Sequence, residues 1–188
     1  MTKPNTQQLR IIGGEWRSRR LRFPAVDGLR PTLDRVRETV FNWLQFDIHN
    51  ATVLDAFAGS GAMGFEALSR GAAQAVFLEK NAKAALQLKE NLTTLGATNA
   101  EVWAGDALLW LSQNPRPFDV VFLDPPFGQN LLQPAVDALT HLPSGALVYL
   151  EHEASLQLNL PNHWLERKQK TTKEFCFRLF EVQNQQGS

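Results

Sequence analysis

The chain has 188 residues, a length that fits one domain with room for a small appendage. No apolar run approaches the roughly 18 residues that a membrane helix needs, and the polar start shows no apolar segment of a signal peptide, so we expect a cytoplasmic protein. The single cysteine excludes an internal disulfide, and the four histidines show no metal-ligand spacing with it, so we expect no metal.

Charge is spread unevenly although the net charge is zero. Residues 1–30 hold seven basic and two acidic side chains, a net charge of +5, whereas residues 31–160 hold seven basic and fourteen acidic ones, a net charge of −7. Four of the basic residues form a cluster: Arg17, Arg19, Arg20 and Arg22. Such a cluster is typical of a surface that binds nucleic acid and also of a solvated edge strand. Charge alone leaves both interpretations open.

The first elements are a hairpin and a helix. Residues 9–12, the pair Gly13-Gly14 and a second apolar run from Trp16 to Phe23 predict a β-hairpin. Apolar residues then recur at helical spacing and predict an amphipathic helix over 33–46, with Thr32 as its N-cap.

From Ala51 onward strands and helices alternate. We expect strands at 52–57, 74–79, 101–104, 118–123 and 146–150, and helices at 62–70, from Asn81 to Gly96, at 107–112 and at 131–142. This alternation is typical of βαβ units and predicts an α/β fold with a mostly parallel sheet, in which 118–123 is central. Residues 164–170 and 173–182 predict an antiparallel hairpin on the edge of that sheet.

A glycine-rich loop follows the first of these strands. Gly59, Gly61 and Gly64 have the spacing of the dinucleotide-binding fingerprint, and Glu79 ends the next strand, where a carboxylate binds ribose hydroxyls. A nicotinamide or flavin dinucleotide and S-adenosylmethionine both fit this pattern. Asp55 favours S-adenosylmethionine, because a carboxylate at that strand end would repel a phosphate but suits a sulfonium and an ammonium group.

Three further residues are candidates for the same cofactor. Asp106 is placed to accept a hydrogen bond from an adenine amino group, and the same side chain is placed to cap the helix that follows, so both roles stay open. Thr32 and Arg35 are candidate partners for a cofactor carboxylate, and the alternative of an ordinary helix start with surface charges stays open.

The segment Asp124-Pro125-Pro126-Phe127 follows the central strand directly. Ligands of open α/β sheets bind at this edge. The Asp124 carboxylate and the Pro125 carbonyl provide two acceptors that would hold the N–H groups of an exocyclic base amine and aim its lone pair. Phe127 offers a face on which the extruded base would stack. The alternative is a proline turn that only ends the strand.

These motifs resemble those of class I methyltransferases that act on exocyclic amines. Four blocks together resemble the RsmD-type 16S ribosomal RNA guanine-N2 methyltransferases: residues 10–17, 29–38 and 41–44, and residues 55–62, which contain the glycine loop. The resemblance implies S-adenosylmethionine as donor, a guanine N2 amine of small-subunit ribosomal RNA as acceptor, and a segment 30–38 that closes over the methionine end of the cofactor. We further expect a Rossmann-like catalytic domain over 51–188 with an N-terminal appendage over 1–50, a monomer, and 16S rRNA within the small ribosomal subunit or an assembly intermediate as partner.

The resemblance and the motifs together define a predicted site. Its cofactor-binding residues are Asp55, Ala58, Gly59, Ser60, Gly61, Glu79, Asp106, Thr32 and Arg35; its catalytic residues are Asp124, Pro125 and Phe127; its RNA-binding residues are Arg17, Arg19, Arg20 and Arg22.

Three alternatives remain for the function. Adenine-N6 methylation of RNA or DNA uses the same two acceptors, so the Asp124–Phe127 segment does not distinguish it. A dinucleotide oxidoreductase is disfavoured by Asp55 and Asp124. An RNA-binding assembly factor with a vestigial pocket is disfavoured by the intact set of Asp55, Glu79 and Asp124.

Overall fold

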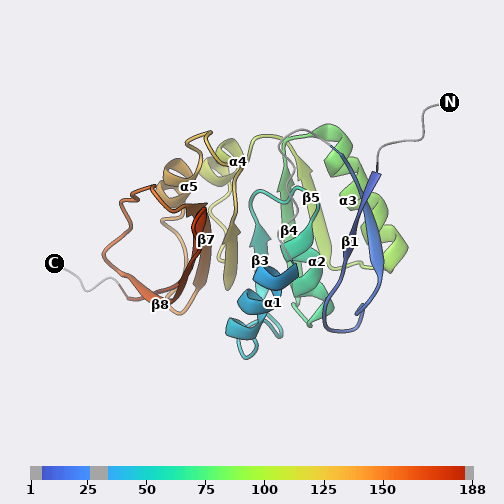
Figure 1. Cartoon of the computed structure of the whole chain (residues 1–188), viewed down its shortest axis with the longest axis horizontal. Helices are drawn as coiled ribbons and strands as arrows, with labels where there is room; N and C mark the ends of the chain where they lie inside the picture. Colours follow the sequence, from blue (N-terminus) through green and yellow to red (C-terminus); the bar gives the residue numbers. More distant parts are fainter. Residues whose placement is uncertain (1–5, 26–33, 185–188) are drawn as a thin grey trace.

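The computed structural model describes residues 6–25 and 34–184, and its centre is a twisted seven-stranded sheet (Figure 1). Its strands follow the order β5-β4-β3-β6-β7-β9-β8. They are β3 (Thr52–Asp55), β4 (Gln74–Glu79), β5 (Ala100–Ala104), β6 (Val120–Leu123), β7 (Leu147–Glu153), β8 (Trp164–Thr171) and β9 (Phe175–Val182). The pairings among β3 to β7 are parallel, and those of β7 with β9 and of β9 with β8 are antiparallel. This confirms the predicted α/β fold with its C-terminal hairpin.

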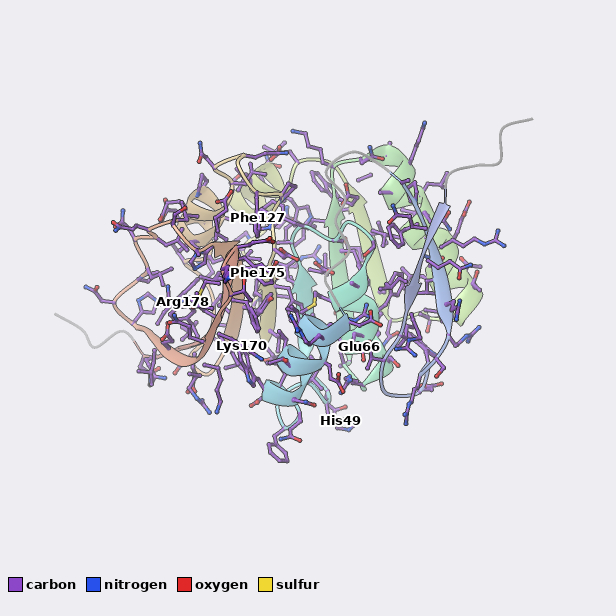
Figure 2. The ribbon with its side chains drawn as sticks, in the orientation of Figure 1. His49, Glu66, Phe127, Lys170, Phe175 and Arg178 are labelled. Atoms are coloured by element: carbon purple, nitrogen blue, oxygen red, sulfur yellow. The ribbon has the colours of Figure 1, made fainter. Side chains whose placement is uncertain are left out.

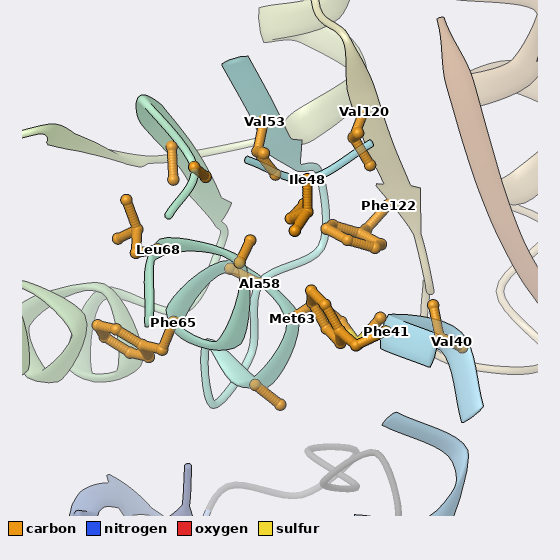
Figure 3. Packing of buried hydrophobic residues seen from close by; sticks show 14 of the residues in the cluster. Val40, Phe41, Ile48, Val53, Ala58, Met63, Phe65, Leu68, Val120 and Phe122 are labelled. Carbon is orange, nitrogen blue, oxygen red and sulfur yellow. The ribbon is translucent and has the colours of Figure 1, made fainter. Parts of the chain in front are cut away.

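Helices cover both faces of the sheet. They are α1 (Asp34–Trp43), α2 (Ala62–Ser69), α3 (Ala82–Leu95), α4 (Ala107–Gln113) and α5 (Leu132–Ala138). One hydrophobic cluster joins α1, α2 and α3 to the sheet through residues such as Phe41, Phe65 and Phe122 (Figure 3), and a second joins α4 and α5 to the other face. All four residues of β6 are buried, as a central strand between two helical layers requires.

Helix boundaries follow local signals where the sequence provides them. Asn81 accepts hydrogen bonds from the backbone N–H groups of Lys83 and Ala84, and Gly96 ends α3 with a left-handed φ of 68°, as predicted. Helix α5 is shorter than the expected 131–142, because it ends at Ala138 and a turn follows. Within the described residues no helix is both long and apolar enough to span a bilayer.

The N-terminal hairpin differs from its prediction. Its strands are β1 (Thr6–Arg10) and β2 (Arg20–Pro24), with Arg10 paired to Arg20, so the connection runs over residues 11–19 rather than over two glycines. Ser18 has φ 70° and interrupts the expected strand from Trp16. Strand β2 packs on α3. We call residues 6–25 the arm.

Candidate functional site

The predicted site residues gather where the parallel strands end. Asp55 is the last residue of β3, Glu79 is the last residue of β4, and Asp124 follows the last residue of β6. Because β3 pairs in parallel with both β4 and β6, these carboxylates lie along one edge of the sheet. The carboxyl edge of an open α/β sheet is the usual place for a ligand.

Glu79 fastens the glycine loop to the start of α3. Its Oε2 accepts a hydrogen bond from the Gly59 N–H at 2.7 Å, and its Oε1 accepts one from the Asn81 N–H at 2.7 Å. A carboxylate has about four acceptor positions. The Glu79 side chain therefore has capacity for two ribose hydroxyls while it holds the loop in place.

Asp55 lies beneath the same loop and is 3% exposed. Its Oδ2 accepts a hydrogen bond at 3.0 Å from the N–H of Gly64, in the first turn of α2. Burial raises the pKa of Asp55 to about 7, the hydrogen bond from Gly64 opposes this rise, and the charge of Glu79 adds to it. A cation bound beside Asp55 would favour the ionised carboxylate.

Two glycines of the fingerprint are required by packing. A Cβ on Gly61, which has φ 80°, would lie 2.4 Å from the ring of Phe65, and a Cβ on Gly64 would lie 2.2 Å from the ring of Phe77. A side chain at position 64 would therefore push α2 away from β4, whereas one at position 61 would collide with a ring of α2 itself and with Leu88 of α3. The fingerprint spacing alone does not identify a ligand, whereas Glu79 and the buried Asp55 fit one with ribose hydroxyls and a cationic group.

Asp106 caps α4, one of its two predicted roles. Its Oδ1 accepts hydrogen bonds from the backbone N–H groups of Leu108 and Leu109, and its Oδ2 lies 3.5 Å from the ammonium of Lys80. The hydrogen bond from Leu109 is the main reason that the pKa of Asp106 is lowered. The proposed contact with adenine stays a prediction.

Four further predicted cofactor residues remain: two lie in the glycine loop and two lie at or just before the start of α1 in the sequence. Ala58 and Ser60 are buried, and the carbonyl of Ala58 accepts a hydrogen bond from the Gly61 N–H at 2.6 Å. Arg35 is exposed near the start of α1. Thr32 lies outside the described residues. The roles given to all four stay predictions.

The Asp124–Phe127 segment leaves the sheet beside the glycine loop. Asp124 is half-buried, Pro125 is buried, and the Phe127 ring stands in the loop after β6 with 37% of the residue exposed (Figure 2). An exposed ring next to a half-buried carboxylate suits a flat ligand with N–H donors on its edge.

The four arginines proposed to bind RNA are all exposed, but they do not share one strand. Arg20 and Arg22 lie on β2 and alternate with buried residues, so their side chains share a face. Arg17 and Arg19 lie in the preceding connection, and Arg19 donates a hydrogen bond to the carbonyl of Thr94 at 3.3 Å.

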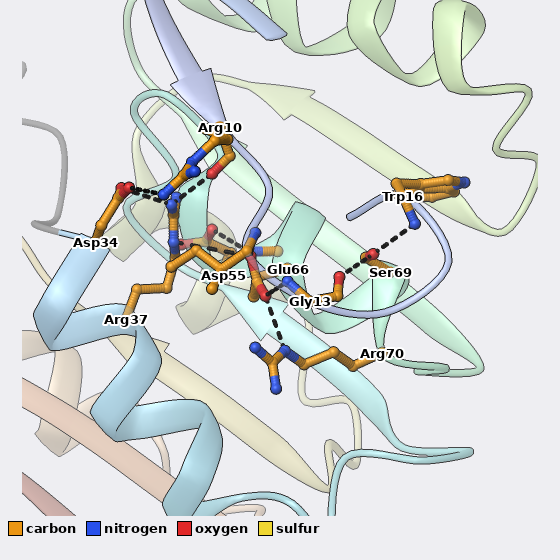
Figure 4. A network of polar contacts seen from close by, with 11 residues as sticks. Arg10, Gly13, Trp16, Asp34, Arg37, Asp55, Glu66, Ser69 and Arg70 are labelled. Carbon is orange, nitrogen blue, oxygen red and sulfur yellow. Dashed lines mark hydrogen bonds and ion pairs between the residues drawn. The ribbon is translucent and has the colours of Figure 1, made fainter. Parts of the chain in front are cut away.

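A buried polar network that the sequence did not reveal fixes the arm to α2 (Figure 4). Glu66 is fully buried and accepts hydrogen bonds from the N–H groups of Ile12 and Gly13 and from the guanidinium of Arg70, at 2.8–2.9 Å. Arg37 of α1, also fully buried, forms an ion pair with Glu66 at 3.8 Å and donates a hydrogen bond to the carbonyl of Arg10. Burial lowers the pKa of Arg37, and the charge of Glu66 opposes that shift. The only hint in the sequence is a single charged residue within the apolar helix 62–69.

A second feature that the sequence did not reveal lies within β7, beside the point where β6 ends. The buried Tyr149 hydroxyl donates a hydrogen bond to Oε2 of Glu151 at 3.0 Å. Both residues belong to the strand next to the one that precedes Asp124. No local motif indicated them, because the proximity depends on strand pairing. Among the described residues no group of three His, Cys, Asp or Glu side chains is arranged to hold a metal ion.

Comparisons with known proteins identify the family. The model of the family "Conserved hypothetical protein 95" matches residues 9–181. The chain is 45% identical to ribosomal RNA small subunit methyltransferase D of Escherichia coli over 192 aligned residues, which cover 98% of this chain and 97% of that protein.

Solved structures agree with the fold. The Escherichia coli protein yhhF superposes with a TM-score of 0.89 at 45% identity and covers 95% of this chain and 100% of that one. The Thermus thermophilus 16S rRNA N2 G1207 methyltransferase, solved with AdoMet and guanosine, superposes with a TM-score of 0.70 over 95% of this chain and 50% of that one. At 19% identity the second similarity shows the fold alone.

Proposed function

We propose a function for this chain as a member of the Conserved hypothetical protein 95 family, the RsmD-type methyltransferases, to which it belongs. It is an S-adenosylmethionine-dependent enzyme that methylates the exocyclic N2 amine of a guanine in 16S ribosomal RNA. The observation that supports this most directly is the alignment of three carboxylates, Asp55, Glu79 and Asp124, along the carboxyl edge of the parallel sheet.

Each site residue has a role in this reaction. Glu79 binds the ribose hydroxyls of the cofactor, and Asp55 faces its cationic end. Bound S-adenosylmethionine supplies an electrophilic methyl group, which the N2 lone pair takes while the bonding electrons of the C–S bond stay on sulfur. Asp124 and the Pro125 carbonyl hold the two N–H groups of the amine, and Asp124 takes the proton that the methylated nitrogen releases. Phe127 stacks on the base.

The proposal also specifies where the enzyme acts, its oligomeric state and its substrate particle. We propose that it acts in the cytoplasm as a monomer, on 16S rRNA within the small subunit or an assembly intermediate, and that residues 1–50 form an appendage of the catalytic domain 51–188. The direct test offers the purified protein tritiated S-adenosylmethionine and small subunits from a strain that lacks the enzyme. N2-methylguanosine among the digested nucleosides supports the proposal; N6-methyladenosine, or binding of NADH in place of S-adenosylmethionine, contradicts it.

Cofactor affinity is expected to depend on pH through Asp55. Its carboxyl group has a pKa of about 7, so it is largely neutral below pH 7 and ionised above it. Because a cationic ligand binds the ionised form, S-adenosylhomocysteine, which keeps the ammonium group, should bind about tenfold more weakly at pH 6 than at pH 8, as linkage to one proton predicts. Calorimetry at the two pH values measures this ratio.

Asp55→Asn is the matched control for that measurement. The amide oxygen still accepts the hydrogen bond from Gly64, but the side chain no longer titrates. The variant should bind with low affinity at both pH values. If it shows the same pH dependence as the wild type, another group is responsible and the role of Asp55 is wrong.

The arm is expected to contribute phosphate contacts through β2. The double substitution Arg20→Ala, Arg22→Ala should weaken RNA binding and reduce the slope of log K against log salt by about 0.7 per lost contact, while cofactor affinity stays unchanged. Binding titrations at several salt concentrations test this. The control Lys83→Ala, Lys89→Ala removes the same charge from exposed positions of α3. Equal effects of the two double variants would mean that only net charge matters.

A further inference from the structure

Two carboxylates occupy neighbouring positions where β6 ends beside β7. The last parallel pair of these strands is Leu123 with Leu150, and the next residues along the two chains are Asp124 and Glu151. Neighbouring strands lie about 4.8 Å apart. Leu123 and Leu150 both pack into the cluster of α4 and α5, so alternation directs the next two side chains toward the opposite face.

Tyr149 holds the second carboxylate in place. Its side chain is fully buried on the face covered by α1, and its hydroxyl donates to Oε2 of the half-buried Glu151 at 3.0 Å. Burial raises the pKa of Tyr149 well above its ordinary value, and the charges of Glu151 and Asp124 raise it further, so the phenol stays a donor.

Phe177 of β9 borders the same place from the other side. It is the cross-strand partner of Glu151, and its ring stacks on Trp43 of α1 with 5.4 Å between the ring centroids. Glu151 therefore lies between the strand that precedes Asp124 and the ring of Phe177, and the Tyr149 hydroxyl orients one of its two carboxylate oxygens. A carboxylate has acceptor positions for both the hydroxyl and a base N–H.

The two bases that such a site could methylate differ beside the reacting amine. Guanine presents the N1–H donor next to its N2 amine, so its edge offers three N–H hydrogens in a row. Adenine presents the N1 lone pair next to its N6 amine, and a carboxylate facing that lone pair would be repelled. A site with Asp124 and Pro125 alone does not distinguish guanine from adenine. A second carboxylate discriminates against adenine, because bound adenine would leave that acceptor without an N–H partner.

We propose that Glu151 is the residue that selects guanine: its carboxylate accepts the N1–H of the base whose N2 amine Asp124 and Pro125 hold, and Tyr149 positions it. This inference rests on the proposed function and adds a base-specificity element to it.

The test separates base choice from general activity. Small subunits are reconstituted with guanine or with 2-aminopurine at the methylated position; 2-aminopurine keeps the N2 amine but has a lone pair at N1. The wild type should prefer guanine in kcat/KM by about ten- to a hundredfold, the range for a hydrogen bond to a charged group. Glu151→Gln should lose most of that preference, because its amide N–H suits the lone pair and not the N1–H.

Control variants and control measurements show whether a change in base preference is specific to Glu151. Glu153→Gln removes the same charge two residues along β7 and should keep the wild-type preference. Glu151→Gln should also keep the wild-type melting temperature and S-adenosylhomocysteine affinity, since its amide oxygen still accepts from Tyr149. If Glu151→Gln keeps the wild-type preference for guanine, the proposal is overturned. If the wild type methylates neither substrate, the proposed function itself fails, and the wild-type arm alone reveals this.

Tyr149→Phe tests the positioning role separately. It removes the hydroxyl and leaves the carboxylate, so kcat/KM for guanine should fall by about three- to tenfold while the preference over 2-aminopurine persists, since a neutral hydrogen bond contributes less than a charged one. Wild-type kinetics in this variant would show that Tyr149 does not position Glu151.

Discussion

Asp124→Ala is expected to reduce methyl transfer by at least about a hundred- to a thousandfold, the cost of removing one preorganised partner of a reacting group. The carboxylate holds the amine and takes its proton, so both the aim of the lone pair and the release of the proton suffer. Affinity for S-adenosylhomocysteine should stay within about twofold of the wild type, because Asp55 and Glu79 hold the cofactor. Single-turnover kinetics and calorimetry measure the two effects.

Asp124→Asn refines that result. Its amide oxygen still accepts one N–H but cannot take the proton, so its rate should lie between those of the wild type and the alanine variant. Asp47→Ala removes an exposed carboxylate just after α1 and should leave the rate unchanged. Wild-type turnover by Asp124→Ala would remove this residue from the mechanism.

Glu66→Gln should lower the free energy of unfolding by about 3–5 kcal/mol, the range for breaking a buried ion pair. Glu66 accepts from the arm through both oxygens, while glutamine has only one, so its NH₂ group would face a backbone N–H. The change also leaves Arg37, fully buried, without its buried counter-charge. Urea unfolding at equilibrium measures the loss, and because the arm is fixed by these contacts, proteolysis within residues 6–25 should accelerate.

The chain provides a matched control for this variant. Glu101 forms an ion pair with Arg116 at 2.9 Å, but both side chains are more than 40% exposed. Glu101→Gln should therefore cost about 0–1 kcal/mol. Similar losses in the two variants would mean that the Arg37–Glu66 pair does not stabilise the fold as its burial implies.

Features that depend on neighbouring residues were predictable from the sequence. The limits of α3 follow from two local signals. The Asn81 side chain caps the first turn of the helix, and Gly96 adopts the left-handed conformation that ends it. The position of Asp124 follows from the apolar strand that precedes it. The parallel order of the strands follows from their alternation with helices, and Glu79 was located because its distance from the glycine loop is fixed by one βαβ unit.

Features that depend on distant contacts were not predictable. The connection of the arm follows α2 because Ser69 accepts the Trp16 N–H, 53 residues away along the chain, and nothing near Trp16 indicates that partner. Nothing in the local sequence distinguishes Arg37 from Arg35, because only the packing of α1 on the sheet buries the first and leaves the second exposed. Only the pairing of β7 with β6 brings Glu151 to a position beside Asp124, and that pairing is not evident from the residues around Glu151.

The outer edge of β8 has a consequence for how copies of the protein behave toward one another. Every residue of this strand after Trp164 is exposed, and its outer backbone groups pair with no other strand among the described residues. An open edge of this length is a template on which a second chain could add a strand. The register shift between Glu166 and Lys168 breaks the regular ladder, and the exposed Lys168 and Lys170 place like charges along it, whereas Arg167 is paired with Glu181. Two such edges repel each other, so the molecule resists edge-to-edge aggregation even when it is concentrated.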